Sequence, residues 1–164
     1  MRAGTPLTLG LCHTIRRPTP ESAPTMAKAS CLYPNSSRGV AEILERGFNN
    51  GVVLDSAGNV AETCSSNIFL AKNGIVSTPI PNGTFLAGIT RYRTVKLLRN
   101  AGITVEERTV TLAELDDVDE LFTTGNAGKV QPVNRYEGRD LQPGPLARQA
   151  HELYMAYART QRVI

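Results

Sequence analysis

The stretch GVVLDSAGNVAETCSSNIFLAKNGIVS, residues 51–77, alternates short β-rich runs with turns. The runs are 51–55, 67–72 and 74–77, and the turns that bound them are Asp-Ser-Ala-Gly and Lys-Asn-Gly. Apolar and β-branched runs bounded by Gly, Asn and Asp are typical of strands joined by tight turns. The stretch therefore predicts a meander of antiparallel hairpins that forms a sheet.

Helices are predicted on both sides of this stretch. Val40, Ile43 and Leu44 recur at helical spacing, which predicts a helix over 37–46 with Ser36 as its N-cap. The other expected elements are helices over 90–101 and 144–159, strands over 7–15, 103–110, 120–123 and 130–134, a loop over 124–129, and an irregular proline-rich connection over 16–25. A meander with separated helices favours an α+β fold in a single domain, residues 1–164.

The composition is that of an ordinary globular domain. Of the 164 residues, 41% are apolar, and the net charge of +3 comes from 18 basic and 15 acidic residues. The basic residues are spread along the chain, without the clustered stripe that a nucleic-acid surface needs. We therefore expect one folded domain with no nucleic-acid partner.

Cysteine usage indicates a reducing compartment. Cys12, Cys31 and Cys64 are an odd set without CxxC spacing, and the chain has only two histidines to complete a metal site. This pattern disfavours both a disulfide framework and a zinc site, so we expect no metal and a cytoplasmic location. The mildly apolar run 6–12 is too short for a signal segment or a membrane span, so no membrane partner is expected.

Lys28 is the first candidate for chemistry. It lies within 25–33, Thr-Met-Ala-Lys-Ala-Ser-Cys-Leu-Tyr, among small and apolar residues, and the hydroxyl of Tyr33 follows five positions later. Such surroundings are expected to desolvate the amine and make it a nucleophile for carbonyl chemistry. Most lysines are solvated surface residues, and that alternative stays open when the segment is considered alone.

Glu62 is the second candidate. It lies in the segment 58–70 between a turn and a strand, and a run of small polar residues follows it. A carboxylate held in such a place can pair with a heterocyclic nitrogen and keep it protonated. The alternative is a polar loop at a sheet edge, in which Asn67 serves as a turn-stabilising side chain.

Two further segments fit anion binding. The glycine-bearing loop 82–91 runs into a predicted helix with Thr90 in its first turn, where free N–H groups and the helix dipole favour a phosphate. The polar segment 123–128 lies between two predicted strands and can hold a phosphate or a carboxylate. The alternatives are an ordinary N-cap for the first segment and a plain hairpin loop for the second.

Taken in order, these four segments resemble the class IV aminotransferases, the fold-type-IV family that uses pyridoxal phosphate. The resemblance runs from about Pro18 to Arg159. It rests on the pieces Ala-Lys-…-Tyr, Gly-Asn-Val-Ala-Glu-…-Asn-Ile-Phe, Leu-Ala-Gly-Ile-Thr-Arg and Thr-Gly-Asn-Ala-…-Pro-Val. It implies the larger, C-terminal pseudo-barrel domain of that family, with mixed, mostly antiparallel strands and flanking helices, and pyridoxal 5'-phosphate as the cofactor.

The resemblance also assigns a role to each matching position. It implies that Lys28 forms a Schiff base with the cofactor and shuttles a proton to and from the substrate α-carbon. It implies that Tyr33 hydrogen-bonds the phenolic oxygen of the cofactor and that Glu62 pairs with the pyridinium nitrogen. The remaining implied contacts are the ring face for Leu86, the phosphate for Ile89, Thr90 and Asn126, and the substrate for Asn126 and Ala127.

The C-terminal third looks closest to the branched-chain aminotransferases, on the residues 124–126, 129–133 and 141–145. This implies transfer of the amino group from leucine, isoleucine or valine to 2-oxoglutarate, so the small-molecule partners are an amino acid and a 2-oxo acid. A D-amino-acid aminotransferase and a 4-amino-4-deoxychorismate lyase stay open as alternatives. A small apolar pocket distinguishes such substrates only modestly.

The chain also departs from the family. Full-length relatives carry an N-terminal small domain before the lysine segment, whereas only residues 1–27 precede Lys28 here. In the family that domain supplies a phosphate-binding arginine, and Arg2, Arg16 and Arg17 are not in a matching context. We therefore expect this domain to be absent, and we expect a homo-oligomer or a partner that supplies it. The alternative is a truncated, inactive binding or assembly module.

Overall fold

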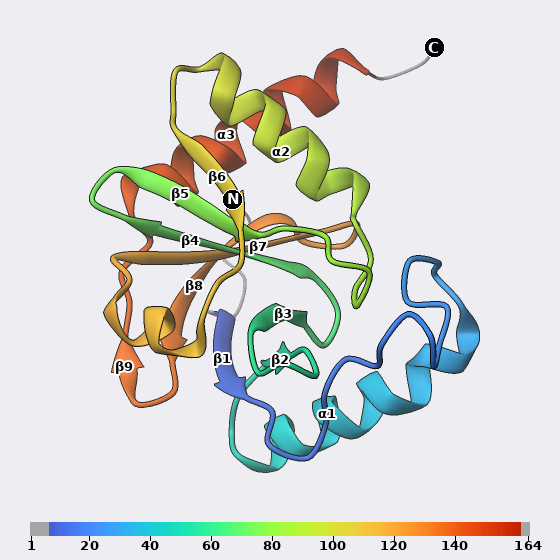
Figure 1. The fold of residues 1–164 in the computed structure, drawn as a ribbon. Helices are drawn as coiled ribbons and strands as arrows, with labels where there is room; N and C mark the ends of the chain where they lie inside the picture. The colour runs from blue at the N-terminus through green and yellow to red at the C-terminus, as the bar shows by residue number, and fades with distance from the viewer. Residues whose placement is uncertain (1–6, 162–164) are drawn as a thin grey trace.

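A computed structural model describes residues 7–161 of the chain and confirms the α+β class (Figure 1). The helices are α1 (Tyr33–Glu45), α2 (Ile89–Asn100) and α3 (Pro145–Thr160), with short 3-10 helices at Ser30–Leu32 and Leu112–Asp117. The strands are β1 (Leu7–Leu11), β2 (Asn50–Leu54), β3 (Val60–Thr63), β4 (Asn67–Lys72), β5 (Ile75–Pro79), β6 (Val105–Arg108), β7 (Glu120–Gly125), β8 (Lys129–Tyr136) and β9 (Arg139–Asp140).

The strands form one mixed sheet in the order β3-β2-β1-β8-β7-β4-β5-β6, with β9 paired to β8. β1 is parallel to β2 and β8, and β5 is parallel to β6, whereas the other pairs are antiparallel. The predicted hairpin of 67–72 with 74–77 is confirmed as β4 with β5. The run 51–55 is also a strand, but it pairs with β3. The sequence did not predict β3, because the buried Glu62 and Thr63 interrupt its apolar pattern.

The sheet curls until its two edges meet. The Val60 N–H donates to Val110 O at 2.9 Å, and Asn59 forms an isolated bridge with Thr111. These bonds join β3 at one edge to the segment that follows β6 at the other edge, which produces the predicted pseudo-barrel. Its interior is filled by buried apolar side chains, which include Leu9, Val52, Leu54, Ile68, Leu70, Val110, Leu115, Leu121 and Val133.

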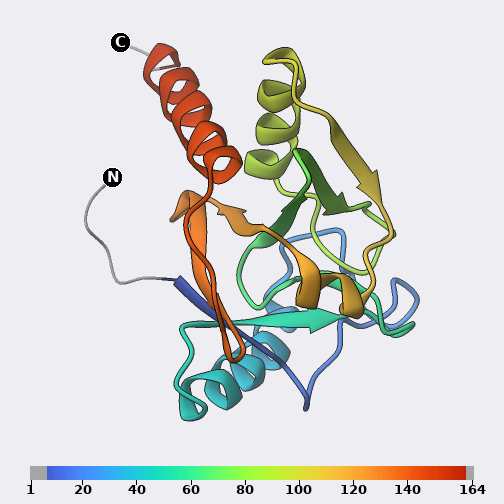
Figure 2. The same cartoon turned by 90° about the vertical axis from the view of Figure 1, so that its left-hand side faces the viewer.

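Helices cover the outside of the sheet at opposite ends of the molecule, with α2 and α3 at one end and α1 at the other (Figure 2). Because side chains alternate along a strand, β4 directs Ile68 and Leu70 into the barrel and Phe69 and Ala71 outward. The Phe69 ring stacks on Phe122 at a centroid distance of 4.8 Å. The helices complete this outer core with Val95, Leu98, Ala147 and Ala150.

Helix α1 begins at Tyr33, four residues before the predicted start, so Ser36 lies inside the helix and is not its N-cap. Pro34 explains the difference. It lies in the first turn, where a fixed φ suits the helix and the missing N–H has no partner to lose. The helix ends near the predicted boundary, where Gly47 adopts a φ of 80°.

Two predicted strands are shorter in the structure. β1 ends at Leu11 and not at Ile15, because the Glu42 carboxylate accepts the backbone N–H groups of His13 and Thr14 at 2.7 and 3.0 Å. β6 covers only 105–108, since the chain then turns to meet β3. Conversely, β7 and β8 extend into the predicted loop 124–129 and leave only a tight turn.

The helix over Leu112–Asp117 was not predicted, although Thr111 and Glu114 form a capping box, a known signal for a helix start. The ends of α2 and α3 lie within one residue of the predicted ends. In the described residues, no helix is long and apolar enough to cross a membrane. Residues 1–6 and 162–164, which belong to the predicted domain and include Arg2, lie outside the described part of the chain.

Candidate functional site

Two adjoining cavities open between the segment that leads into α1, the connection from β3 to β4, and the start of α2. The first has a volume of about 410 Å³ and the second about 520 Å³. Lys28, Glu62, Ser65 and Leu86 line both, so the two form one connected site. Volumes of a few hundred Å³ are typical of small-molecule and cofactor sites.

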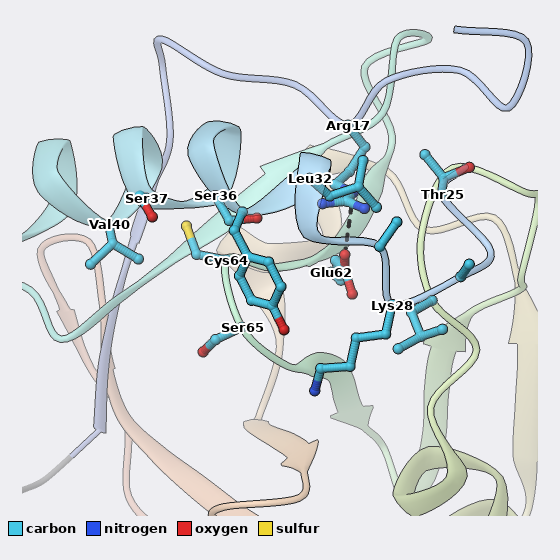
Figure 3. Close-up of a pocket in the computed structure, with 14 residues that line it drawn as sticks. Arg17, Thr25, Lys28, Leu32, Ser36, Ser37, Val40, Glu62, Cys64 and Ser65 are labelled. Carbon is cyan, nitrogen blue, oxygen red and sulfur yellow. Dashed lines mark ion pairs between the residues drawn. The ribbon is translucent and has the colours of Figure 1, made fainter. Parts of the chain in front are cut away.

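Glu62 lies at the inner end of the first cavity, on β3. Its carboxylate Oε1 is 3.2 Å from Nε of Arg17, and both side chains are buried (Figure 3). Burial raises the pKa of Glu62 to about 7, and the Arg17 guanidinium only partly opposes that rise. The site therefore contains a buried acid that exchanges its proton near neutral pH.

Arg17 was not predicted to be a site residue, yet it lies in the wall of the first cavity. Its backbone N–H donates to Leu54 O at 2.8 Å, and its Nε donates to Thr84 O at 3.0 Å. Thr84 belongs to the loop 82–88 that precedes α2, and Thr25 Oγ1 donates to Gly83 O in the same loop. Arg17 thus joins the segment before Lys28, the loop before α2, and Glu62.

Asn67 holds the same loop from the other side. Its Nδ2 donates to Leu86 O at 2.9 Å and lies 3.5 Å from Glu62 Oε2. The alternative of a turn-stabilising side chain is therefore wrong, because the buried amide connects β4 to the loop and not to its own turn. A Cβ at Gly88 would overlap Asn67 Oδ1, so this contact depends on a glycine at the N-cap of α2.

The start of α2 faces the second cavity. Gly88 is the N-cap, and no side chain caps the helix, so its first-turn N–H groups remain available to an anion. Thr90 is buried at this helix start, whereas the side chain of Ile89 is 80% exposed. Thr124 Oγ1, which also lines this cavity, is buried and has no hydrogen-bond partner among the described residues. The arrangement fits a phosphate-sized anion.

Lys28 extends across the site below Glu62, and its ammonium nitrogen points toward the side where Ser65 lies (Figure 3). The side chain is solvent-exposed, so the desolvation expected from its small and apolar neighbours is not present. The physical reason is that Ala27 is itself exposed and Ala29 is only half-buried, so these small neighbours do not shield the amine from water. Tyr33, at the first position of α1, also lines the cavity and is 53% exposed.

The predicted site residues are brought together with one exception. Lys28, Tyr33, Glu62 and Leu86 line the first cavity, and Ile89, Thr90 and Asn126 join Lys28, Glu62 and Leu86 around the second. Ala127 lines neither cavity and is exposed in the turn after β7.

Hydrogen bonds also shape the connection from β3 to β4, which sequence reasoning did not resolve. Thr63 Oγ1 lies 2.7 Å from Ser66 Oγ, and Asn50 Nδ2 donates to Ser65 Oγ at 2.9 Å. These contacts hold Ser65 at the boundary of the two cavities and leave Cys64 in the wall of the first. The only sign of this connection in the sequence was the run of small polar residues that follows Glu62.

Comparison with known proteins agrees with this geometry. The family model described as amino-transferase class IV matches residues 3–136. A probable branched-chain-amino-acid aminotransferase of Aquifex aeolicus is 38% identical over 143 residues, which cover 85% of this chain and 46% of that protein. The chain thus spans about half the length of this relative.

Solved structures give the same family. An aminotransferase from Brucella abortus, bound to the cofactor PLP, has a TM-score of 0.92 at 44% identity, and the match covers 97% of this chain and 57% of that one. A branched-chain aminotransferase from Thermoproteus uzoniensis, with norvaline, has a TM-score of 0.90 at 30% identity and covers 96% and 52% of the two chains.

Proposed function

This chain belongs to the amino-transferase class IV family, and we propose that it binds pyridoxal phosphate and contributes the cofactor site of a branched-chain aminotransferase. The observation that carries the proposal is the connected site in which Lys28 lies between the buried acid Glu62 at one end and the anion-binding start of α2 at the other. The Brucella abortus relative binds this cofactor, and the Aquifex aeolicus relative bears the name of this enzyme.

The residues present fit the cofactor at both ends. A buried carboxyl that is partly ionised near neutral pH, with Oε1 held by Arg17, suits the pyridine nitrogen. The uncapped start of α2, with Ile89 and Thr90, suits the phosphate, and the orphaned Thr124 hydroxyl lies beside it. Pyridoxal phosphate, when bound, supplies an electron sink that makes the proton on the substrate α-carbon removable.

The other predicted side chains that line the two cavities are each assigned a role. We assign Leu86 to the face of the ring, Tyr33 to its phenolic oxygen, and Asn126 to the phosphate side of the site. Lys28 has a flexible, accessible amine that reaches both cavities. We assign to it the covalent attachment of the cofactor and the movement of the proton at the substrate α-carbon.

The substrates we propose are a branched-chain L-amino acid and 2-oxoglutarate. The name of the Aquifex aeolicus relative, and norvaline in the Thermoproteus uzoniensis structure, support this choice. We further propose that residues 1–164 correspond to the larger, cofactor-binding domain of the family and that Ala127 contacts substrate. A cytoplasmic location and a homodimer are part of the same proposal.

Cofactor binding is tested by mixing the purified chain with pyridoxal phosphate, recording the visible spectrum, reducing with borohydride and mapping the labelled peptide. The pyridoxyl group is expected on Lys28, and Lys28→Ala is expected to remove it. Lys96→Ala, an exposed lysine on α2, is the matched control and should keep the label. Labelling that persists in Lys28→Ala would exclude Lys28 from this role.

Activity is tested separately, by the rate of amino transfer from leucine, isoleucine and valine to 2-oxoglutarate, with the D-enantiomers and 4-amino-4-deoxychorismate as competing substrates. The branched-chain L-amino acids are expected to be preferred. Label on Lys28 with no transfer would leave the chain as a cofactor-binding module, which is the alternative stated from the sequence.

A further inference from the structure

Two cysteine thiols meet beneath the first cavity. Cys12 Sγ lies 3.5 Å from Cys64 Sγ, although the two residues are far apart in the sequence. Cys12 follows β1 and its N–H donates to Val52 O, whereas Cys64 follows β3 and its N–H donates to Gly51 O. Both residues therefore bond to β2 from its opposite sides, and their sulfur atoms meet over that strand.

Gly51 makes this contact possible. A Cβ at this position would overlap Cys12 Sγ and lie 3.2 Å from Cys64 Sγ. Gly39 of α1 plays the same part on the other side, since a Cβ there would lie 3.0 Å from Cys64 Sγ. Two glycines thus leave the space in which the two sulfur atoms approach each other.

The two thiols are not equivalent. Cys12 is fully buried, whereas Cys64 is partly exposed and lines the cavity that Lys28 also lines. The hydrogen bond between the two thiols lowers the pKa of Cys64 and raises the pKa of Cys12. Cys64 is therefore the thiol of the pair that a reagent in the cavity can reach. A lowered pKa favours its thiolate, which is the reactive form of cysteine.

We propose that Cys64 is an oxidation site for hydroperoxides and that Cys12 resolves it into an internal disulfide. This inference concerns the thiol pair alone and does not rest on the proposed aminotransferase function. The third cysteine, Cys31, is exposed and lines neither cavity, so we assign it no part.

The chemistry is balanced with hydrogen peroxide as oxidant. The Cys64 thiolate attacks one peroxide oxygen, the O–O bond breaks, and the departing hydroxide takes up a proton to form water. Cys12 then attacks the sulfur of the resulting sulfenic acid, the S–O bond breaks, and its proton leaves with the hydroxide as a second water. The thiols lose two electrons in total and the peroxide gains them. A dithiol reductant reverses the change.

The disulfide requires a small movement. The sulfur atoms must close from 3.5 Å to the bond length of about 2.05 Å. Cys64 begins the connection 64–66 and lies outside the ladder of β3, so the required shift falls on a loop.

The test treats the reduced chain with one equivalent of hydrogen peroxide, blocks remaining thiols with an alkylating agent, and maps peptides by mass spectrometry without reduction. A Cys12–Cys64 peptide pair, lighter by two hydrogens, is expected, with the loss of two of the three free thiols. Dithiothreitol should restore all three.

Two variants sharpen the test. Cys31→Ser, the matched control at the surface, should form the same disulfide as the natural chain. Cys12→Ser should stop at a sulfenic acid on Cys64, which dimedone traps. Cys12 and Cys64 both recovered alkylated while Cys31 is oxidised, or a disulfide that includes Cys31, would overturn the proposal. The natural chain and Cys31→Ser decide this even if Cys12→Ser does not fold.

Discussion

Arg17 Nε lies 3.2 Å from Glu62 Oε1 and 3.0 Å from Thr84 O, so one buried guanidinium joins three segments of the site. The pair differs from a surface ion pair because both side chains are buried and shielded from solvent. Removal of charges from water costs free energy that their attraction repays only in part. This imbalance is the reason that the pKa of Glu62 stands at about 7 despite its cation.

The first prediction concerns Glu62 and pH. Its folded pKa of about 7 lies above the ordinary value of 4.5, so the folded chain keeps a proton that the unfolded chain has lost. The stability from this proton is complete below pH 4.5 and is lost as the pH rises through 7. Glu62→Gln does not titrate, so between pH 5 and 8 its free energy of unfolding should rise relative to the natural chain by about 2 kcal/mol.

Urea unfolding at both pH values measures this difference. Glu45→Gln, which removes an exposed carboxyl from α1, is the control and should shift the free energy of unfolding equally at the two pH values. A pH-independent difference for Glu62→Gln would contradict the assignment of a raised pKa.

The second prediction concerns Arg17. Arg17→Gln removes the cation beside Glu62 and the bond to Thr84 O, so the pKa of Glu62 should rise further. The free energy of unfolding should fall by about 2 to 3 kcal/mol at pH 8, and by less at pH 5, where Glu62 is protonated. Arg16→Gln, at the exposed neighbour, should cost much less. Equal losses for the two variants at pH 8 would refute the buried ion pair.

Local signals in the sequence predicted the elements that depend on local order. The strand 67–72 was predicted with its observed ends, because turn residues bound its β-rich run on both sides. Helices α2 and α3 were predicted because their apolar spacing and end signals lie within the elements. The start of α1 was missed, since Ser36 was predicted as the N-cap, whereas the helix already begins at Tyr33 with Pro34 in its first turn.

Contacts between distant segments could not be predicted in this way. Arg17 bonds to a carbonyl 67 positions along the chain, and no feature near Arg17 reveals that partner. Pairing of β1 with both β2 and β8, and closure of the barrel at Val60 and Val110, likewise depend on the whole fold. The order of four motifs predicted residues that the fold brings to the two cavities, except Ala127, whereas the network that holds Glu62 follows from the tertiary structure alone.

The third prediction concerns the loop before α2. Asn67→Ala removes the amide that donates to Leu86 O at 2.9 Å, so the loop 82–88 should exchange its amide hydrogens faster. The free energy of unfolding should fall by about 1 to 2 kcal/mol, because a partly buried carbonyl loses its donor. Asn35→Ala removes a similar bond, to Arg16 O at 3.0 Å, in an exposed place and should cost less. Unchanged exchange in 82–88 would show that Asn67 does not hold the loop.

The fourth prediction concerns Thr124, whose buried hydroxyl has no partner among the described residues. Thr124→Val removes an unsatisfied polar atom at nearly constant volume, so the free energy of unfolding of the cofactor-free chain should rise by about 1 kcal/mol. If the hydroxyl serves the phosphate end of the site, the same variant should bind pyridoxal phosphate about 5-fold more weakly, which corresponds to about 1 kcal/mol.

Thr94→Val is the matched control for this prediction. Thr94 is equally buried, but its Oγ1 donates to Thr90 O at 2.8 Å, so the substitution should lower the free energy of unfolding by about 1 kcal/mol. Opposite signs for two buried threonines would identify the Thr124 hydroxyl as an unpaired group kept for a ligand. A Thr124→Val chain that is both less stable and unchanged in its dissociation constant for pyridoxal phosphate would instead show that the hydroxyl is paired within the protein and serves no anion.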